Sequence, residues 1–101
     1  MAQFDVYCNI NPISLEEIPY LLDIQADLLS GLSTRVVVPL TRQSKNIQHL
    51  NPLFEINGEK VVMLTQELSG VDKNILGDKV CSLMGRRSEI IAALDFLVSG
   101  F

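Results

Sequence analysis

Residues 53–65, LFEINGEKVVMLT, contain the clearest structural signal in the chain. Two strand-forming runs, 53–56 and 59–65, flank the dipeptide Asn57-Gly58, which can hold positive φ at both centres of a type I′ turn. A two-residue turn of this kind also fixes the register of the strands that it joins. The predicted cross-strand pairs are Ile56 with Glu59, Glu55 with Lys60, and Phe54 with Val61. Because the middle pair joins opposite charges, the side chains agree with the turn, and the stretch predicts a β-hairpin.

Three more strands are predicted before the hairpin. Residues 4–8 alternate Phe4, Val6 and Cys8 with Asp5 and Tyr7, the period of a strand with two different faces. Alternation resumes at 20–25, which predicts a second strand. Residues 34–40 are a β-branched run stopped by a proline, and we expect this third strand to be the most buried.

The connections between these strands are polar. Residues 9–17 and 26–33 predict loops, and residues 41–51 predict an exposed and mobile loop that carries His49, the only histidine. Residues 67–84 contain short apolar pieces broken by glycines, which fit either brief strands or single helical turns.

The end of the chain has a different period. From Gly85 onward, apolar residues recur at helical spacing, namely Ile90, Ile91, Leu94, Leu97 and Val98. Gly100 is expected to end this helix. With no internal repeat and no linker in 101 residues, the sequence predicts one domain over residues 1–101, mainly β with one C-terminal α-helix. The pattern alone leaves a barrel and a sandwich equally open.

Charge and composition exclude several classes. Twelve acidic and eight basic side chains give a formal charge of -4, opposite in sign to a surface that neutralises phosphates, so direct binding of nucleic acid is disfavoured. The amino terminus does not resemble a signal peptide and no stretch is long enough to cross a bilayer, so we expect no membrane association. Cys8 and Cys81 lie far apart without CxxC spacing, which favours a reduced, cytoplasmic protein with two packed thiols over one with a structural disulfide.

The search for catalytic motifs finds little. The chain has no HExxH, no glycine-rich phosphate loop and no Cys/His cluster. His49 fits a solvated surface histidine better than a general base, and Cys8 fits a core thiol better than a nucleophile. We therefore expect a protein that is not an enzyme, with no catalytic residues, no metal and no cofactor.

The last residue, Phe101, follows a helix-stopping glycine and has no later residues to cover it. Its ring either folds back onto the protein or serves as an aromatic anchor for a partner. The residues of the tail do not decide between these alternatives.

Several segments, in order and spacing, resemble toxins of the CcdB family from end to end. They are Gln3-Phe4-x-Val6-Tyr7, residues 23–27 (DIQAD), residues 34–40 (TRVVVPL), Met63-Leu64-Thr65, and the helix from Glu89-Ile90-Ile91 to Gly100. The resemblance implies an SH3-like β-barrel of the CcdB/MazF type that forms a twofold homodimer. It also implies a type II toxin that binds the DNA gyrase A subunit and traps the gyrase–DNA cleavage complex. The other implied partner is a CcdA-like antitoxin that neutralises the toxin, and the operator DNA is reached only through the toxin–antitoxin complex, which represses its own operon.

The resemblance also implies a gyrase-binding site. The family tail is Trp-Gly-Ile, of which Gly100 matches, while Ser99 replaces the tryptophan and Phe101 the isoleucine. Asp95 stands where the family often has asparagine. Gln3, Phe4 and Tyr7 match family positions near the same surface, although ordinary strand packing explains Phe4 and Tyr7 equally well.

Two other functions remain. A MazF-type endoribonuclease has the same barrel and would use Arg35 with Ser33 or Thr34, but the acidic surface neutralises an RNA backbone poorly. A degenerate toxin that binds only its antitoxin is the second, suggested by Ser99 in place of the tryptophan.

Overall fold

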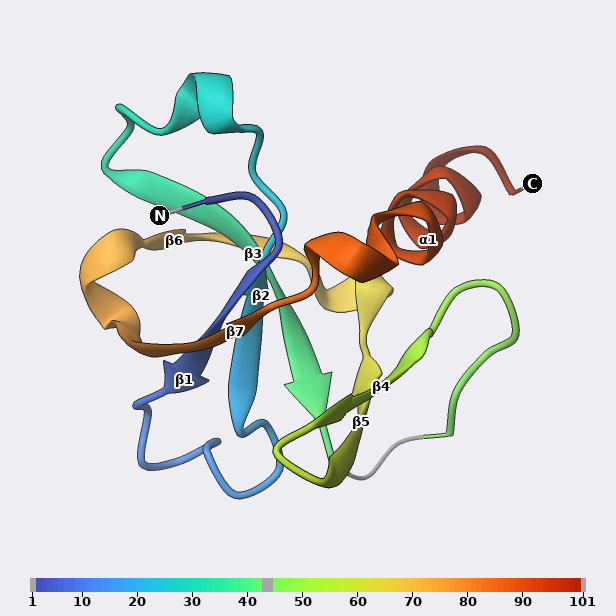
Figure 1. The fold of residues 1–101 in the computed structure, drawn as a ribbon, viewed down its shortest axis with the longest axis horizontal. Helices are drawn as coiled ribbons and strands as arrows, with labels where there is room; N and C mark the ends of the chain where they lie inside the picture. Colours follow the sequence, from blue (N-terminus) through green and yellow to red (C-terminus); the bar gives the residue numbers. More distant parts are fainter. Residues whose placement is uncertain (1, 43–44, 101) are drawn as a thin grey trace.

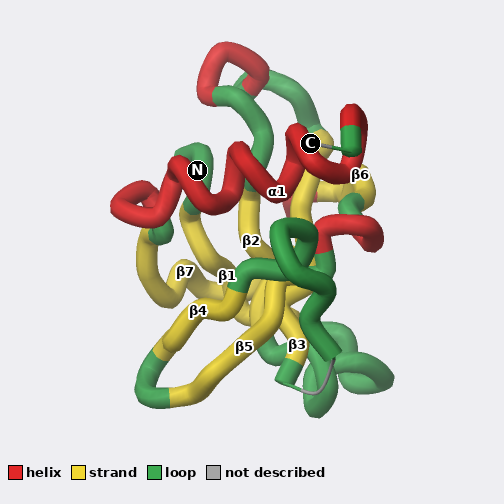
Figure 2. The backbone as a smooth tube through the Cα atoms, turned by 90° about the vertical axis from the view of Figure 1, so that its right-hand side faces the viewer, coloured by secondary structure: helices red, strands yellow, loops and turns green. Residues whose placement is uncertain are grey.

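The computed structural model describes residues 2–42 and 45–100. Its strands are β1 (Asp5–Asn9), β2 (Tyr20–Asp23), β3 (Thr34–Thr41), β4 (Leu53–Ile56), β5 (Glu59–Met63), β6 (Ser69–Asp72) and β7 (Leu76–Ser82). Short 3-10 turns, η1 (Asp27–Leu29), η2 (Thr65–Glu67), η3 (Lys73–Ile75) and η4 (Met84–Arg86), join some of them, and one helix, α1 (Arg87–Ser99), closes the chain. Figure 1 shows a strongly curled sheet with α1 at one side, and Figure 2 shows the same helix lying across the strands.

The sheet is antiparallel throughout, in the order β4-β5-β3-β2-β1-β7, and β6 also pairs with β3. The first half of β3 pairs with β6 and its last two residues pair with β5. One strand that serves two partners on the same edge bends the sheet toward a half-barrel. The prediction of a mainly β, SH3-like barrel with one C-terminal helix is confirmed.

The hairpin is confirmed in detail. β4 and β5 pair in the predicted register, with Ile56 opposite Glu59, Glu55 opposite Lys60, and Phe54 opposite Val61. Asn57 has φ 52° and Gly58 has φ 79°, the pair of positive values that a type I′ turn requires.

β3 carries five buried residues, more than any other strand, as expected. It does not stop at Pro39 but continues to Thr41. Pro39 lies in the gap between the β6 partners and the β5 partners of this strand, and its carbonyl accepts a hydrogen bond from the N–H of Leu64. Because no partner strand needs an N–H at this position, a proline is tolerated here.

The predicted opening strand is confirmed as β1, but it is buried on both faces over its first residues. Val6 is buried as expected, but Asp5 and Tyr7 on the other face are buried too, and Cys8 is only half-buried. The chain from β6 to β7 curves around this second face (Figure 1), so Asp5 and Tyr7 are shielded from solvent. Phe4 precedes the strand and has φ 71°.

The undecided segment 67–84 contains both kinds of structure, since β6 and β7 alternate with 3-10 turns. β7 pairs with β1 through a register shift. Gly77 allows this approach, because a Cβ on it would lie 2.7 Å from Ile10 Cγ2 and 2.9 Å from the Cys8 carbonyl oxygen. The sequence analysis noted that glycines interrupt this segment, but it did not predict that Gly77 lets β7 pack closely against β1.

One hydrophobic core fills the curl of the sheet. Its members include Phe4, Val6, Leu22, Val38, Leu40, Phe54, Ile56, Val61, Met63, Leu83, Ile90 and Ala93. Helix α1 contributes only Ile90 and Ala93 as fully buried residues, while Leu97 and Val98 are exposed. The predicted apolar face of the helix therefore covers the core in its first half and extends beyond it in its last turn.

Candidate functional site

The exposed end of α1 is the first candidate site. Asp95, Ser99 and Gly100 are all exposed. Gly100 has φ 76° and donates its N–H to the carbonyl of Phe96, a left-handed cap that only glycine adopts without strain. The Ser99 hydroxyl donates to the Asp95 carbonyl at 2.7 Å, so this side chain lies back along the helix. The predicted helix end at Gly100 is confirmed, and Phe101 lies outside the described residues.

The first half of the helix holds this end in place. Ile90 and Ala93 are 0 % exposed and pack in the same cluster as Phe4. The carbonyl of Phe4 also accepts a hydrogen bond from the N–H of Leu83, just before the helix. The core therefore anchors the first half of the helix, and Figure 1 shows α1 at one side of the sheet.

Of the three predicted N-terminal site residues, two are buried and one is half-buried. Phe4 and Tyr7 are buried, and Gln3 is half-buried, with its side-chain amide on the Ile24 carbonyl and its backbone N–H on Asp27. For Phe4 and Tyr7 the structure supports strand packing, and their burial excludes direct contact with a partner in this conformation.

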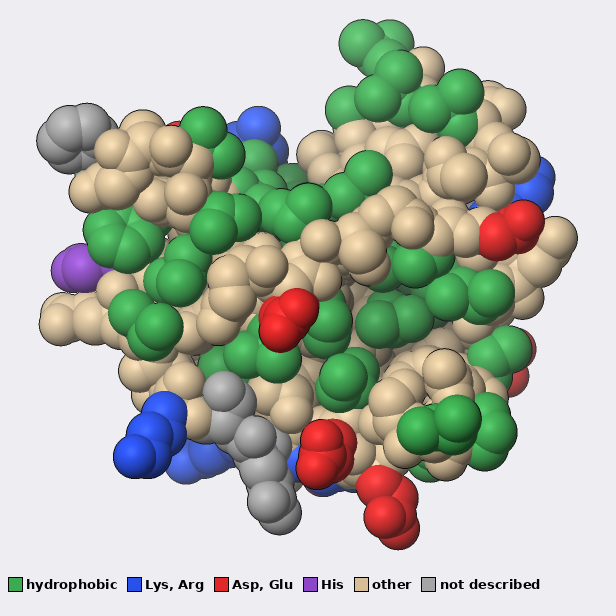
Figure 3. Space-filling view, turned by 180° about the vertical axis from the view of Figure 1, so that it is seen from behind, with side chains coloured by type: hydrophobic (Ala, Val, Ile, Leu, Met, Phe, Trp, Pro, Cys, Tyr) green, Lys and Arg blue, Asp and Glu red, His purple; other side chains and the backbone are tan. Residues whose placement is uncertain are grey.

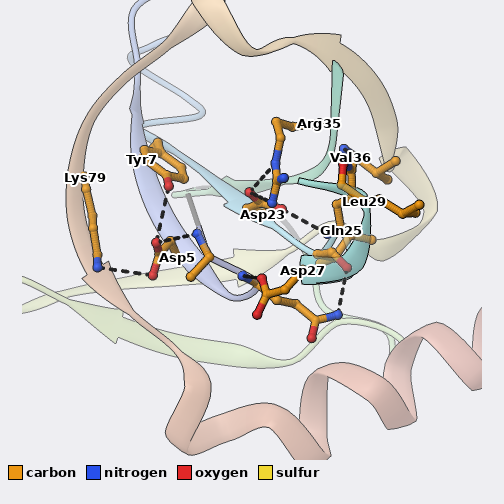
Figure 4. A network of polar contacts seen from close by, with 12 residues as sticks. Asp5, Tyr7, Asp23, Gln25, Asp27, Leu29, Arg35, Val36 and Lys79 are labelled. Carbon is orange, nitrogen blue, oxygen red and sulfur yellow. Dashed lines mark hydrogen bonds and ion pairs between the residues drawn. The ribbon is translucent and has the colours of Figure 1, made fainter. Parts of the chain in front are cut away.

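A buried polar network lies behind β1 (Figure 4). Arg35 donates through Nε to Asp23 Oδ2 at 2.7 Å, its Nη2 lies 2.6 Å from the same oxygen, and both side chains are almost fully buried. Tyr7 donates its hydroxyl to Asp5, whose other oxygen lies 3.3 Å from Lys79 Nζ. Sequence reasoning missed this cluster because the alternation placed Asp5 and Tyr7 on a separate face from Phe4 and Val6 and did not show what covers that face. The opposite charges at 23 and 35, in strands that pair, were the available signal.

Burial governs the acidity of this network. Desolvation raises the pKa of Asp23, although the Gln25 N–H and the Arg35 guanidinium act in the opposite direction. Burial, and then the negative charge of Asp5, raise the pKa of Tyr7 to about 12. The network therefore keeps the Tyr7 phenol protonated, and its two ion pairs join β2 to β3 and β1 to β7.

A groove of about 590 Å³ lies between residues 46–53 and α1, and Figure 2 shows this segment passing beneath the helix. It is lined by Asn46, Gln48, His49, Asn51, Pro52, Leu53, Glu89, Ala92 and Phe96. His49 has φ 70°, and its ring lies 6.0 Å from the ring of Phe96. No sequence signal marked this groove, because its two walls come from distant segments.

Within 2–42 and 45–100, no three His, Cys, Asp or Glu side chains are placed to hold a metal ion, and no helix has the length and hydropathy to cross a bilayer. Cys8 and Cys81 are free thiols, and burial raises the pKa of Cys81, so its thiol is a weaker nucleophile than usual.

The family model for the CcdB protein matches residues 3–100, nearly the whole chain. The chain belongs to the CcdB toxin family. The match includes the strands of the curled sheet, the whole of α1 and Gly100, and so both the fold and the exposed helix end are parts of a CcdB domain.

A solved structure is similar to this CcdB-family chain in fold. It is an endoribonuclease in complex with its cognate antitoxin from a mycobacterial species, with a TM-score of 0.77 and 16% sequence identity over 97% of this chain and 94% of that chain. At this identity the likeness shows a shared barrel and no more. In the CcdB-family chain, Arg35, the residue considered for RNA cleavage, is 1 % exposed and bound to Asp23, so it is not placed to meet a substrate.

Proposed function

We propose that this chain is the toxin of a type II toxin–antitoxin pair, and that it binds the DNA gyrase A subunit and traps the gyrase–DNA cleavage complex. The observation that carries this proposal is the end of α1, where Asp95, Ser99 and Gly100 are exposed on a helix anchored in the core by Ile90 and Ala93. A fixed, solvent-facing tail suits insertion into a partner. The toxin acts by binding alone, without catalysis.

A homodimer would present two such tails to the twofold gyrase. Leu97 and Val98 in the last turn of α1 are exposed, and Val98 retains 87 % of its accessible surface. Hydrophobic side chains are also exposed over much of the face in Figure 3. Apolar surface of this extent favours association with a second copy, and paired tails on a symmetric partner gain affinity by avidity.

The second proposed partner is a CcdA-like antitoxin, which neutralises the toxin and, in complex with it, binds the operator and represses transcription in the cytoplasm. The structural neighbour described above was solved with its cognate antitoxin, which supports a partner of this kind. The net charge of -4 favours a basic antitoxin that folds as it binds. A degenerate toxin would still bind the antitoxin but would no longer bind gyrase.

Gyrase-mediated DNA cleavage with the purified protein tests the proposal. We expect cleaved DNA to accumulate with the full chain, and we expect deletion of Ser99, Gly100 and Phe101 to abolish this effect while the protein stays folded, because these residues follow the last buried position of α1. Substitution of Leu28, which is 98 % exposed in the distant η1 turn, is the control. Cleavage that persists without the tail refutes the tail mechanism. Cleavage of labelled RNA by the same preparation would support the ribonuclease instead.

A further inference from the structure

The residue that follows each asparagine decides whether the side-chain amide can react with the backbone. Proline offers no N–H for such a reaction, and the branched Cβ of isoleucine crowds the approach to the preceding side chain. Asn57 alone precedes a glycine, Gly58, which has neither obstacle. The other asparagines are Asn9, Asn46 and Asn74 before isoleucine, and Asn11 and Asn51 before proline.

The turn leaves Asn57 and Gly58 open to water. Both residues are exposed, and nothing lies within 4 Å of the position that a Cβ on Gly58 would take. The Asn57 side chain makes no hydrogen bond in the part of the chain that the structure describes. The side-chain amides of Asn9 and Asn51, by contrast, are held by backbone carbonyls. Figure 2 shows this turn at the end of the hairpin farthest from α1, so no neighbouring element covers it.

These two residues can react with water and no other reagent. The Gly58 nitrogen loses its proton to hydroxide and attacks the side-chain carbonyl carbon of Asn57. The new bond closes a succinimide ring, and the side-chain nitrogen leaves as ammonia with a proton from water. A second water opens the ring at the side-chain carbonyl, which gives aspartate, or at the backbone carbonyl, which gives isoaspartate. The net change is ammonia lost and water gained, with no oxidation or reduction.

The two products act differently on the hairpin. Aspartate leaves the backbone unchanged, and Asp-Gly holds a type I′ turn as Asn-Gly does. Isoaspartate carries the chain through its side chain and so adds a carbon to a two-residue turn. The register that pairs Phe54 with Val61 depends on the length of that turn. Isoaspartate therefore weakens the pairing of β4 with β5, and aspartate does not.

The hairpin supports the start of α1. The Arg86 guanidinium lies 4.8 Å from the Phe54 ring centre and donates to the Leu53 carbonyl. Phe54 and Ile56 also share the core cluster of Ile90 in the first turns of the helix. A change in the register of β4 moves these contacts, so it reaches the helix that carries the exposed chain end.

We propose that Asn57 is a site of spontaneous deamidation, in which water replaces the side-chain amide, and that the isoaspartate product loosens the hairpin and the start of α1. The chain thereby carries a slow chemical limit on the lifetime of its native fold. Solvent alone drives this change, and it holds whether or not the chain binds gyrase.

Peptide mapping by mass spectrometry, after incubation of the full-length protein at neutral and mildly alkaline pH, tests the site. We expect the mass change of amide to acid in the peptide that holds Asn57, with a rate that rises with hydroxide concentration because the Gly58 nitrogen must lose its proton. An isoaspartyl methyltransferase should label the same peptide. An unchanged Asn57, or equal rates at Asn57, Asn46 and Asn74, would overturn the proposal.

Two variants test the effect on the fold. Asn57→Gly is the matched control, because Gly-Gly also holds a type I′ turn but has no amide to lose, and its thermal midpoint should stay constant during incubation. Freshly purified Asn57→Asp should unfold at the midpoint of the parent. The isoaspartate fraction, separated by chromatography, should unfold at a lower midpoint and exchange the amide hydrogens of β4 and early α1 faster. If this fraction behaves as Asn57→Asp does, the link from the turn to α1 is refuted.

Discussion

Two arginine–carboxylate pairs of similar geometry occupy opposite environments in this molecule. Arg35 and Asp23 approach to 2.6 Å with 1 % and 0 % of their side chains exposed, whereas Arg86 and Glu89 approach to the same 2.6 Å with 43 % and 50 % exposed. A buried pair has lost its water, so removing one partner leaves an uncompensated charge. In an exposed pair both charged groups stay solvated whether or not they are paired, so the pair contributes little to stability. The comparison assigns the first pair to the architecture and the second to the solvated surface.

The largest expected effect comes from breaking the buried pair. Asp23→Ala leaves the Arg35 guanidinium without its carboxylate in the interior, and we expect the free energy of unfolding to fall by about 3–5 kcal/mol. Urea denaturation measures this change. The matched double variant, Asp23→Leu with Arg35→Met, removes both charges and should recover much of the loss. A loss below about 1 kcal/mol for Asp23→Ala would mean that water reaches Arg35.

The next effect appears at high pH, through Tyr7 in the same network. Its pKa is raised from 10.0 to about 12, so the folded protein holds a proton that the unfolded chain releases first. The contribution of Tyr7 to stability is therefore complete below pH 10.0 and is lost as the pH rises through about 12. Relative to Tyr7→Phe, the parent should lose about 2–3 kcal/mol across this window. Parallel pH profiles of the two proteins would contradict the burial of the phenol.

A smaller effect tests the packing of β7 against β1, which encloses the network. Gly77→Ala places a methyl group within 2.7 Å of Ile10 Cγ2 and 2.9 Å of a backbone carbonyl, and we expect a loss of about 1–3 kcal/mol. Gly70→Ala is the matched control, because nothing lies within 4 Å of its added Cβ. Thermal unfolding of both variants gives the difference. Equal midpoints would show that β7 can move away from β1 at no cost.

The sequence predicted local structure better than the two sites. The dipeptide Asn57-Gly58 alone determines the turn between β4 and β5, and the turn sets the register of the two strands. Gly100 likewise ends α1 through its own backbone conformation. Asp5 and Tyr7 followed a period of two that indicates a strand with two different faces, but it did not show that the curl of the sheet buries both of these side chains. That curl depends on pairings between distant strands, such as β1 with β7, and no local pattern encodes them.

The two parts of the candidate site, the helix end and the groove, also differ in how far the sequence could predict them. The exposed helix end could be predicted, because an apolar helix stopped by a glycine leaves its last turn beyond the core. The groove could not, since residues 46–53 and 89–96 meet only after the whole barrel has formed. Phe4 and Tyr7 could be aligned to a family surface, but their burial comes from the packing of this chain.

The exposed pair, Arg86 with Glu89, gives the smallest expected change in stability. Glu89→Gln removes the charge that faces the groove but keeps the side-chain size, and we expect the free energy of unfolding to change by less than about 0.5 kcal/mol, as for other exposed helix pairs. Arg86 has further contacts, since its guanidinium lies 4.8 Å from the Phe54 ring centre and donates to the Leu53 carbonyl, so it can stay in place without Glu89. If the Glu89→Gln protein instead loses as much stability as Asp23→Ala, exposure does not distinguish the two pairs and Glu89 belongs to the architecture.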